Sequence, residues 1–201
     1  MGPSMNYLAH LHLSQPTPLA WLGSLLADFE RSPDHSRYPP ELLAAVQEHR
    51  RIDAFTDNHP AVRTCRRRLA PDFHLLRGVV VDIFFDHMLA LNWSQFSSST
   101  LDTFCQSAYA GLAGLDLPLP PRLAWGLPRM ASQDWLRSYL EIDNVGLALG
   151  GVARRLRRPV DLAQGVVVLR QAHAAIEQDF LTFYPELIDF VRRERQNGEA
   201  G

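Results

Sequence analysis

The stretch that decides the fold is Gly78–Trp93, GVVVDIFFDHMLALNW, in which ionisable side chains interrupt an otherwise apolar run. The apolar character continues from Leu75 to Leu91, a length that favours a helix over a strand. In either conformation Asp82 and Asp86 face the same side, because four residues are about one helical turn and an even number of strand steps. Burying unpaired carboxylates is costly, so we expect a cation to compensate them.

The rest of the chain is also predicted to be helical. Apolar residues recur at three- and four-residue intervals, and strict alternation is scarce, which predicts an all-α fold. The expected helices cover residues 18–29, 41–58, 61–69, 73–92, 101–112, 121–132, 135–140, 142–156 and 162–195. Pro185 is expected to kink or split the last of these helices.

The composition predicts a single-domain helical bundle. With 201 residues, 46% of them hydrophobic and 21% charged, the chain can bury a sizeable core in one domain. We assign this domain to residues 5–201 and interpret MGPS, at positions 1–4, as a cloning remnant. The formal net charge of −2 gives no global attraction to nucleic acid or to a membrane.

Cysteine usage and hydropathy predict a cytoplasmic protein. Cys65 and Cys105 lie far apart, with no CxxC pair and no signal-peptide pattern, as expected in a reducing compartment. No apolar stretch reaches the roughly 18 residues that span a bilayer. The chain contains no lysine, so every basic side chain presents the planar guanidinium fork that suits phosphate and carboxylate.

A second polar pattern lies in EHRRIDAFTDNHP, where His49, Asp53 and Asp57 are spaced by four. On a helix they form one stripe, whose ends are about 12 Å apart, too far to share one ion. His49 and Asp53 could share an ion, which leaves Asp57 to a second ion or to a hydrogen bond with a histidine. Alternatively, Asp57 caps the next helix, and Arg50 or Arg51 pairs with Asp53 in solvent.

Two further segments supply potential metal ligands. Asp28 closes an apolar helix in GSLLADFERS, where its charge is unfavourable with the helix dipole unless a positive charge offsets it. His10 and His12 lie two apart among the leucines of NYLAHLHL. The alternative for this pair is that one ring packs in the core and the other faces water.

These segments together predict a cluster of nitrogen and oxygen ligands without thiolate. The candidates are His10, His12, Asp28, His49, Asp53, Asp57, Asp82, Asp86 and His87. Such a set suits manganese, iron, zinc or magnesium, and it argues against a structural zinc finger. A divalent ion is the simplest compensation for the carboxylates, and an ionic network with arginines is the alternative.

The four motifs NYLAHLHL, GSLLADF, HRRIDAFTD and DIFFDHML, in this order, resemble the acyl carrier protein phosphodiesterase family, also called acyl carrier protein hydrolase. The similarity extends over the whole chain after the first four residues. It implies an HD-domain-like helical fold, related to bacterial guanosine tetraphosphate hydrolases, and dependence on Mn²⁺. It also implies a role in lipid metabolism, namely the removal of the 4'-phosphopantetheine arm from holo acyl carrier protein to leave the apo protein.

The usual HD signature is a His-Asp pair, whereas this chain has Asp86-His87. We therefore assign the metal ligands by motif membership and helical geometry. Five residues rank first, namely Asp28, His49, Asp53, Asp82 and Asp86. His10 is added as a sixth ligand from the lower group, which also contains His12, Asp57 and His87. The resemblance implies phosphodiester hydrolysis, in which Arg50 or Arg51 would neutralise phosphoryl charge. Asp57 or His87 would serve as general base or acid.

Two arginine runs are candidates for binding the acidic carrier protein. The predicted docking residues are Arg63, Arg66 and Arg67 in RTCRRRL, and Arg154, Arg155, Arg157 and Arg158 in ARRLRRP. Nucleic acid is a less suitable partner, because neither run contains interleaved stacking aromatics.

Two other functions fit the same residues. One is an HD-type phosphohydrolase acting on a nucleotide, and the other is a non-enzymatic helical binding protein whose His/Asp cluster is a structural ion network.

Overall fold

The computed structural model describes residues 7–73, 77–155 and 164–199, and its regular elements there are all helical. The predicted all-α class is therefore confirmed. Within the described ranges, no helix combines the length and apolarity needed to cross a bilayer.

The backbone divides into two compact units, each built from two separate segments of chain. Unit 1 comprises Met1–Asp53 and Asn92–Arg137, and unit 2 comprises Ala54–Leu91 and Ser138–Gly201. The boundary between Asp53 and Ala54 falls inside a single helix, α3 (Pro40–Asn58). One domain over residues 5–201 stays a prediction.

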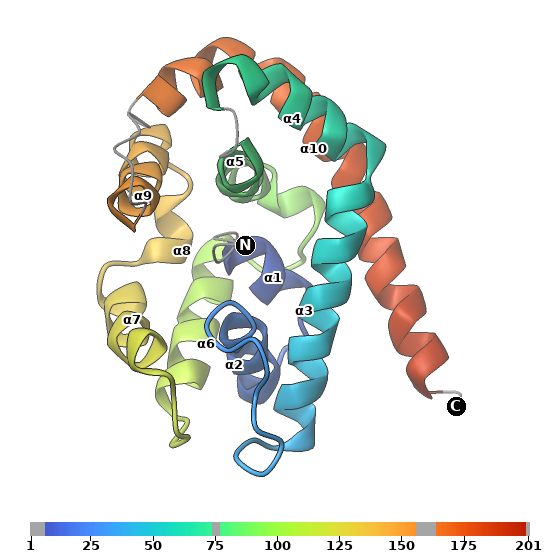
Figure 1. Cartoon of the computed structure of the whole chain (residues 1–201), viewed down its shortest axis with the longest axis vertical. Coiled ribbons are helices and arrows are strands. Elements are labelled where there is room, and N and C mark those ends of the chain that lie inside the picture. The colour runs from blue at the N-terminus through green and yellow to red at the C-terminus, as the bar shows by residue number, and fades with distance from the viewer. Residues whose placement is uncertain (1–6, 74–76, 156–163, 200–201) are drawn as a thin grey trace. The chain divides into compact units, whose positions relative to one another are not determined.

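Unit 1 contains α1 (Tyr7–Leu13), α2 (Pro18–Leu26), most of α3, the short 3₁₀ helix η2 (Trp93–Gln95), α6 (Leu101–Ala113), α7 (Pro121–Ser132) and most of α8 (Trp135–Ser138). Helix α2 packs against α1 and α6, and α6 lies between α2 and α7 (Figure 1). The Thr17 hydroxyl caps α2 by accepting from the Ala20 N–H at 3.2 Å. Pro18 then takes the first helical position, where its missing N–H costs nothing.

A glycine sets the approach of α2 to α3. A Cβ atom at Gly23 would lie 2.2 Å from the backbone oxygen of Leu42 and 2.9 Å from the Cβ of Ala45. No larger residue fits at this crossing without moving one of the helices. The crossing therefore holds the end of α2, and Asp28 just beyond it, against α3.

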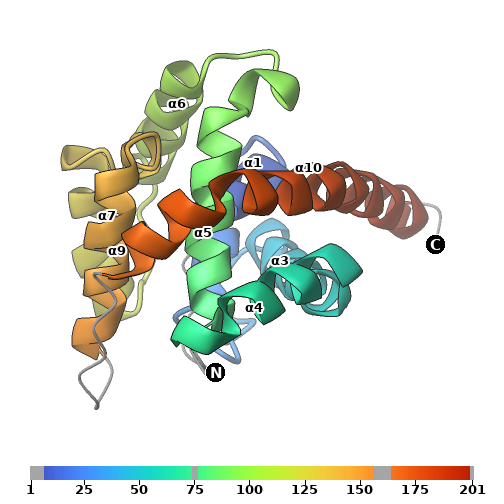
Figure 2. The ribbon, with the colours of Figure 1, turned by 90° about the horizontal axis from the view of Figure 1, so that it is seen from above.

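Unit 2 contains α4 (Pro60–Phe73), α5 (Arg77–Leu91), α9 (Ile142–Arg155) and α10 (Gln164–Glu199). Helix α5 contacts the other three, and α10 crosses it (Figure 2). This explains why the stretch quoted first is apolar on every side: α5 is buried at nearly every position from Val80 to Ala90. His59 precedes α4 and caps its first turn, because its Nδ1 accepts from the Ala61 N–H at 3.3 Å.

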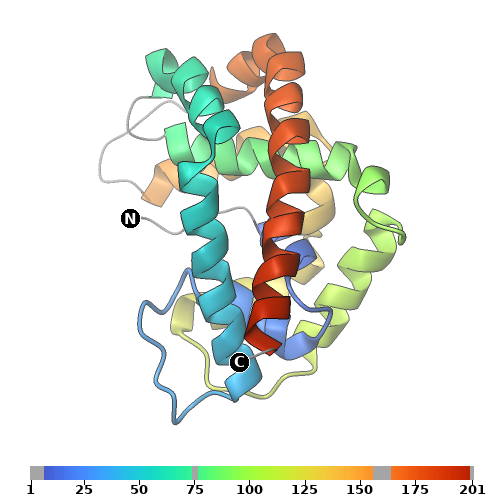
Figure 3. The ribbon, with the colours of Figure 1, turned by 90° about the vertical axis from the view of Figure 1, so that its right-hand side faces the viewer.

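The sequence predictions fail at two helices. Helix α1 was not predicted, because seven residues are too few for a periodicity to show. The expected split at Pro185 is wrong, since α10 continues through it to Glu199 and runs beside α4 without interruption (Figure 3). Buried Phe183, Tyr184 and Leu187 flank this proline, and their packing offsets the lost backbone hydrogen bond.

Replacing Gly23 by Ala is expected to destabilise the protein by about 1–3 kcal/mol, because the new methyl group meets a backbone atom that cannot rotate away. Gly126→Ala is the matched control: it also lies inside a helix, but its Cβ would have nothing within 4 Å. The control should gain about 0.5–1 kcal/mol from helix propensity. Urea denaturation followed by circular dichroism measures both, and equal loss in the two variants would disprove the close approach.

Candidate metal centre

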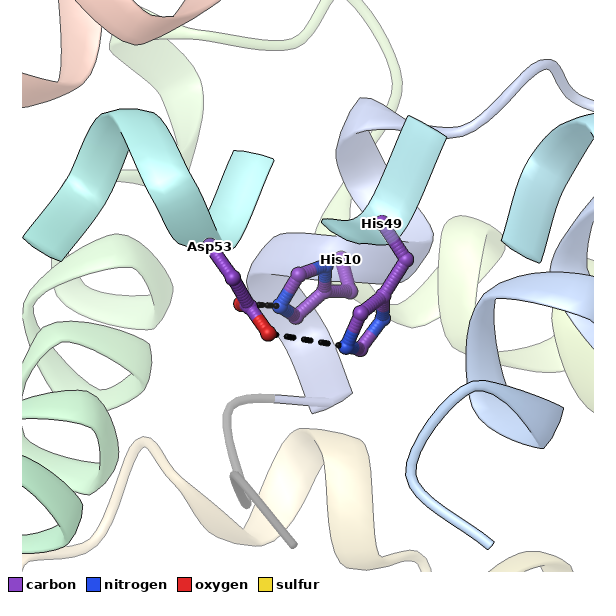
Figure 4. Close-up of side chains that lie close together, drawn as sticks. All are labelled: His10, His49 and Asp53. Carbon is purple, nitrogen blue, oxygen red and sulfur yellow. Dashed lines mark ion pairs between the residues drawn. The ribbon is translucent and has the colours of Figure 1, made fainter. Parts of the chain in front are cut away.

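Three of the predicted ligands lie together: two histidines face the carboxylate of Asp53. His10 comes from α1, and His49 and Asp53 lie one turn apart on α3. The Nε2 atom of His10 lies 3.2 Å from Oδ1 of Asp53, and Nε2 of His49 lies 3.3 Å from Oδ2 (Figure 4). Each oxygen of Asp53 therefore faces a different histidine, so the carboxylate bridges α1 and α3 within unit 1.

Asp28 provides a second carboxylate at the same place. It lies two residues beyond the last residue of α2, and its Oδ1 lies 3.7 Å from Nε2 of His49. Its side chain is 6% exposed, whereas that of Asp53 is 40% exposed. The site is thus closed on the Asp28 side and open to solvent on the Asp53 side.

The two imidazole rings are buried and stacked. Their centroids are 3.7 Å apart with an interplanar angle of 12°. Both ring nitrogens of His10 and Nδ1 of His49 are buried without a partner in hydrogen-bond geometry, although the backbone of Ser24 helps to raise the pKa of His49. Unsatisfied buried nitrogens are costly, and a bound ion or water would satisfy them.

The pKa values of the two histidines shift in opposite directions. Burial and the positive charge of His49 lower the pKa of His10 to about 4. Burial would lower the pKa of His49 as well, but Asp53 and Asp28 raise it above its ordinary value. Burial likewise opposes ionisation of Asp53, yet the two histidines hold its pKa well below the usual range. At neutral pH the site therefore contains an ionised Asp53 and a neutral His10.

These residues fit a divalent ion. Ligand atoms of His10, His49 and Asp53 lie within 4.8 Å of one another. Adjacent ligands at about 2.1 Å from an ion are about 3.0–3.4 Å apart in octahedral or tetrahedral geometry, and the two N···O separations of 3.2 and 3.3 Å agree. Because the rings are nearly parallel, they must tilt apart before both lone pairs converge on one ion.

Asp57 and Asp82 belong to unit 2, where they share an arginine. Nη2 of Arg66 donates to Oδ1 of Asp57 at 2.7 Å and lies 4.0 Å from Oδ1 of Asp82. Arg66 thus lies beside two carboxylates that were predicted as possible metal ligands. This arrangement matches the alternative prediction, in which arginines compensate the carboxylates. Their roles at a metal stay predictions.

Asp86 and His87 are both buried in unit 2. Burial and then the charge of Asp86 raise the pKa of the Tyr184 hydroxyl. Nδ1 of His87 lies 2.5 Å from the carbonyl oxygen of Tyr139, to which it donates because a carbonyl only accepts. Burial lowers the pKa of His87, and the proton on Nδ1 leaves Nε2 of the neutral ring as an acceptor.

Other candidates in unit 1 lie outside the cluster. Nη2 of Arg50 donates to the backbone oxygen of Arg31 at 2.6 Å, which brings Arg50 against the segment that follows Asp28. Arg51 is exposed. The ring of His12 makes an edge contact with Trp93 at 4.9 Å between centroids, and burial lowers its pKa, as expected for a packed histidine.

The arginine runs are only partly described. Arg63 and Arg67 are exposed on α4 and donate to the neutral side chains of Asn58 and Thr64. Arg157 and Arg158 lie outside the described residues, and only the backbone of α9 is described at Arg154 and Arg155.

All members of the cluster were among the residues proposed from the sequence. His10 was placed last of the six ligands because a lone HxH pair is a weak signal. His10 reaches Asp53 only through the contact between α1 and α3. The residue spacing within either segment cannot predict that contact.

Comparison with known proteins finds relatives along nearly the whole chain. The family model described as acyl carrier protein phosphodiesterase matches residues 5–187. A protein of that name from Yersinia pestis is 35% identical over 185 residues, covering 92% of this chain and 96% of that protein. Relatives of the same name from Serratia proteamaculans and Salmonella agona are 36% and 34% identical over 92% and 94% of this chain, and over 96% and 99% of their own lengths. No solved structure matches the chain.

Asp53→Asn is expected to weaken Mn²⁺ binding at least about 100-fold, because the amide keeps the shape of the carboxylate but loses the charge that faces both histidines. Asp102→Asn is the matched control, an exposed carboxylate of the same unit that pairs with Arg137 at 3.5 Å. Isothermal titration of metal-free protein with Mn²⁺ measures both. Unchanged affinity in Asp53→Asn would remove this residue from the site.

Mn²⁺ affinity is also expected to fall as the pH drops from 8 to 6. His49 has a raised pKa and must lose its proton to bind metal, so affinity decreases by up to about tenfold for each pH unit below that pKa. His10, with a pKa of about 4, stays neutral throughout this window. Titrations in two buffers of different ionisation enthalpy count the released proton, and a flat affinity across the range would contradict the assignment.

Proposed function

Because the chain belongs to the acyl carrier protein phosphodiesterase family, and is thereby a phosphoric diester hydrolase, we propose that it releases the 4'-phosphopantetheine arm from holo acyl carrier protein. The products are the apo protein and free phosphopantetheine. The observation that carries this proposal is the meeting of His10, His49 and Asp53 inside the region matched by the family model. Two free, buried cysteines are consistent with action in the cytoplasm.

The metal in this proposal is Mn²⁺, held by His10, His49 and Asp53 with Asp28 beside them. A mixed imidazole and carboxylate set without thiolate supports this choice. When bound, such an ion supplies an activated water and polarises a phosphoryl oxygen. The exposed side of Asp53 gives the phosphodiester access, and the buried side of Asp28 limits the entry of further water.

The candidates from the sequence that lie in unit 2 keep their proposed roles: Asp82 and Asp86 as metal ligands, and Asp57 or His87 as general base or acid. His87 is favoured over Asp57 as general base, because its ring has a lowered pKa and an acceptor Nε2, whereas Asp57 is engaged by Arg66.

Arginines neutralise charge on the substrate. Arg50 is favoured over Arg51 for the phosphoryl oxygens, because it lies against the segment after Asp28. Arg63 and Arg67 offer charge to the acidic carrier protein, whereas Arg66 already faces two carboxylates of its own unit. Arg154, Arg155, Arg157 and Arg158 remain candidates for the same contact.

The test is incubation of the metal-free protein with holo acyl carrier protein, with and without Mn²⁺, followed by intact-mass measurement of the carrier. We expect loss of the arm only with Mn²⁺, and a decrease of at least about 10³-fold in kcat/KM for Asp53→Asn, since the activated water is lost. Asp102→Asn should keep the wild-type rate. Hydrolysis of a nucleotide in place of holo carrier protein, or full activity after chelation, would overturn the proposal.

A further inference from the structure

Helix α7 presents an unusual side chain to solvent. Trp125 is 57% exposed and is the one aromatic among the strongly exposed large hydrophobic side chains of the described residues. More than half of this large apolar side chain therefore stays in contact with water after folding. An exposed tryptophan offers a partner a large apolar face of a type that often dominates binding energy at interfaces.

The exposed tryptophan lies in a stripe of defined charge. Arg122, Trp125 and Arg129 are spaced three and four residues apart, so they share one face of α7, while Leu123 and Met130 are buried. The guanidinium carbon of Arg129 lies 3.9 Å from the centre of the Trp125 ring, and its Nη1 donates to the Trp125 carbonyl at 2.9 Å. These contacts hold the two side chains together before any partner arrives.

The chemistry of the stripe defines the partner. The sequence of α7, PRLAWGLPRMAS, contains two arginines and no acidic residue, so the helix itself carries positive charge on a chain with a net charge of −2. Tryptophan and arginine are the residue types most enriched among energetically dominant interface contacts. The complementary surface is a segment rich in carboxylates with an apolar side chain among them.

We infer that Arg122, Trp125 and Arg129, the α7 stripe, form a surface on which the acidic carrier protein docks. This inference rests on the proposed function and extends it to a surface of unit 1, the unit that holds the metal centre. Carboxylates of the carrier pair with the two guanidinium groups, and an apolar side chain covers the free face of the indole ring.

The Tyr38 hydroxyl lies between the segment that follows Asp28 and the segment that precedes α7, both in unit 1. The Tyr38 hydroxyl lies 2.8 Å from Oε2 of Glu30 and 3.0 Å from the carbonyl oxygen of Pro118, and it can donate to either. Glu30 lies two residues beyond Asp28, and Pro118 lies three residues before the start of α7. Tyr38 thus links the segment before α7 to the segment after Asp28.

The experiment compares Trp125→Ala and Arg122→Glu/Arg129→Glu with matched surface controls, Leu147→Ala and Arg192→Glu/Arg193→Glu. Leu147 is 71% exposed, and both α10 arginines are exposed. Each variant is assayed with Mn²⁺ on holo carrier protein and on bis(p-nitrophenyl) phosphate, a diester too small to reach a docking surface. Binding of apo carrier protein is titrated separately.

The two α7 variants should raise KM for holo carrier protein about tenfold or more, with kcat changed less than twofold, and weaken apo carrier binding to the same extent. Turnover of the small diester and both controls should stay at the wild-type level. If the wild type cleaves holo carrier protein but the α7 variants keep its KM within twofold, the docking surface is refuted. If the wild type leaves holo carrier protein intact, the proposed function fails instead. A single-stranded oligonucleotide that binds the wild type, but not Trp125→Ala, would assign the stripe to nucleic acid and overturn the inference.

Discussion

The bridge that Asp53 makes between two buried histidines is the interaction on which the site depends. Without that carboxylate, protonation of His10 would place an uncompensated charge at a ring stacked 3.7 Å from its neighbour, and only Asp28 would offset the charge of a protonated His49. With it, the rings adopt unequal proton affinities, and α1 and α3 are joined at one point. The closeness that is costly for bare imidazoles is favourable for ligands of a shared cation.

The surrounding helices support this bridge by packing. Gly23 lets α2 approach α3 closely, and this approach brings Asp28 within 3.7 Å of His49. A residue with no side chain therefore contributes to the electrostatics of the site. Ligands on the helix-supported part of a scaffold are held more firmly than ligands on a free loop, which suits a centre assembled from three helices.

The sequence predicted α3 and the closeness of His49 and Asp53, because both rest on local regularity. His49 and Asp53 are one turn apart, and any helix at this point brings them together. Four ordered motifs also identified the family, which the matched relatives confirm. The contact of His10 with Asp53 was not predicted, because Asp53 is 43 residues away and nothing in a seven-residue helix specifies that contact.

Ion pairs between residues far apart in the sequence were also not predictable from local sequence patterns. Arg66 was predicted to serve a partner protein, yet its guanidinium lies beside Asp57 and Asp82 in unit 2. Spacing could not distinguish a solvent-facing arginine from one that faces two carboxylates. Similarly, packing of Phe183 and Leu187 carries α10 through Pro185, where propensity alone predicts a break.

Coordination by both His10 and His49 is the central claim, and pulsed electron paramagnetic resonance of the Mn²⁺-loaded protein tests it most directly. The method detects nitrogen nuclei bound to Mn²⁺ and so counts imidazole ligands. We expect couplings from two nitrogens in the wild type and from one in each of the single variants His10→Gln and His49→Gln. Absence of nitrogen coupling in the wild type, or two couplings retained in either variant, would contradict a metal centre built on these two histidines.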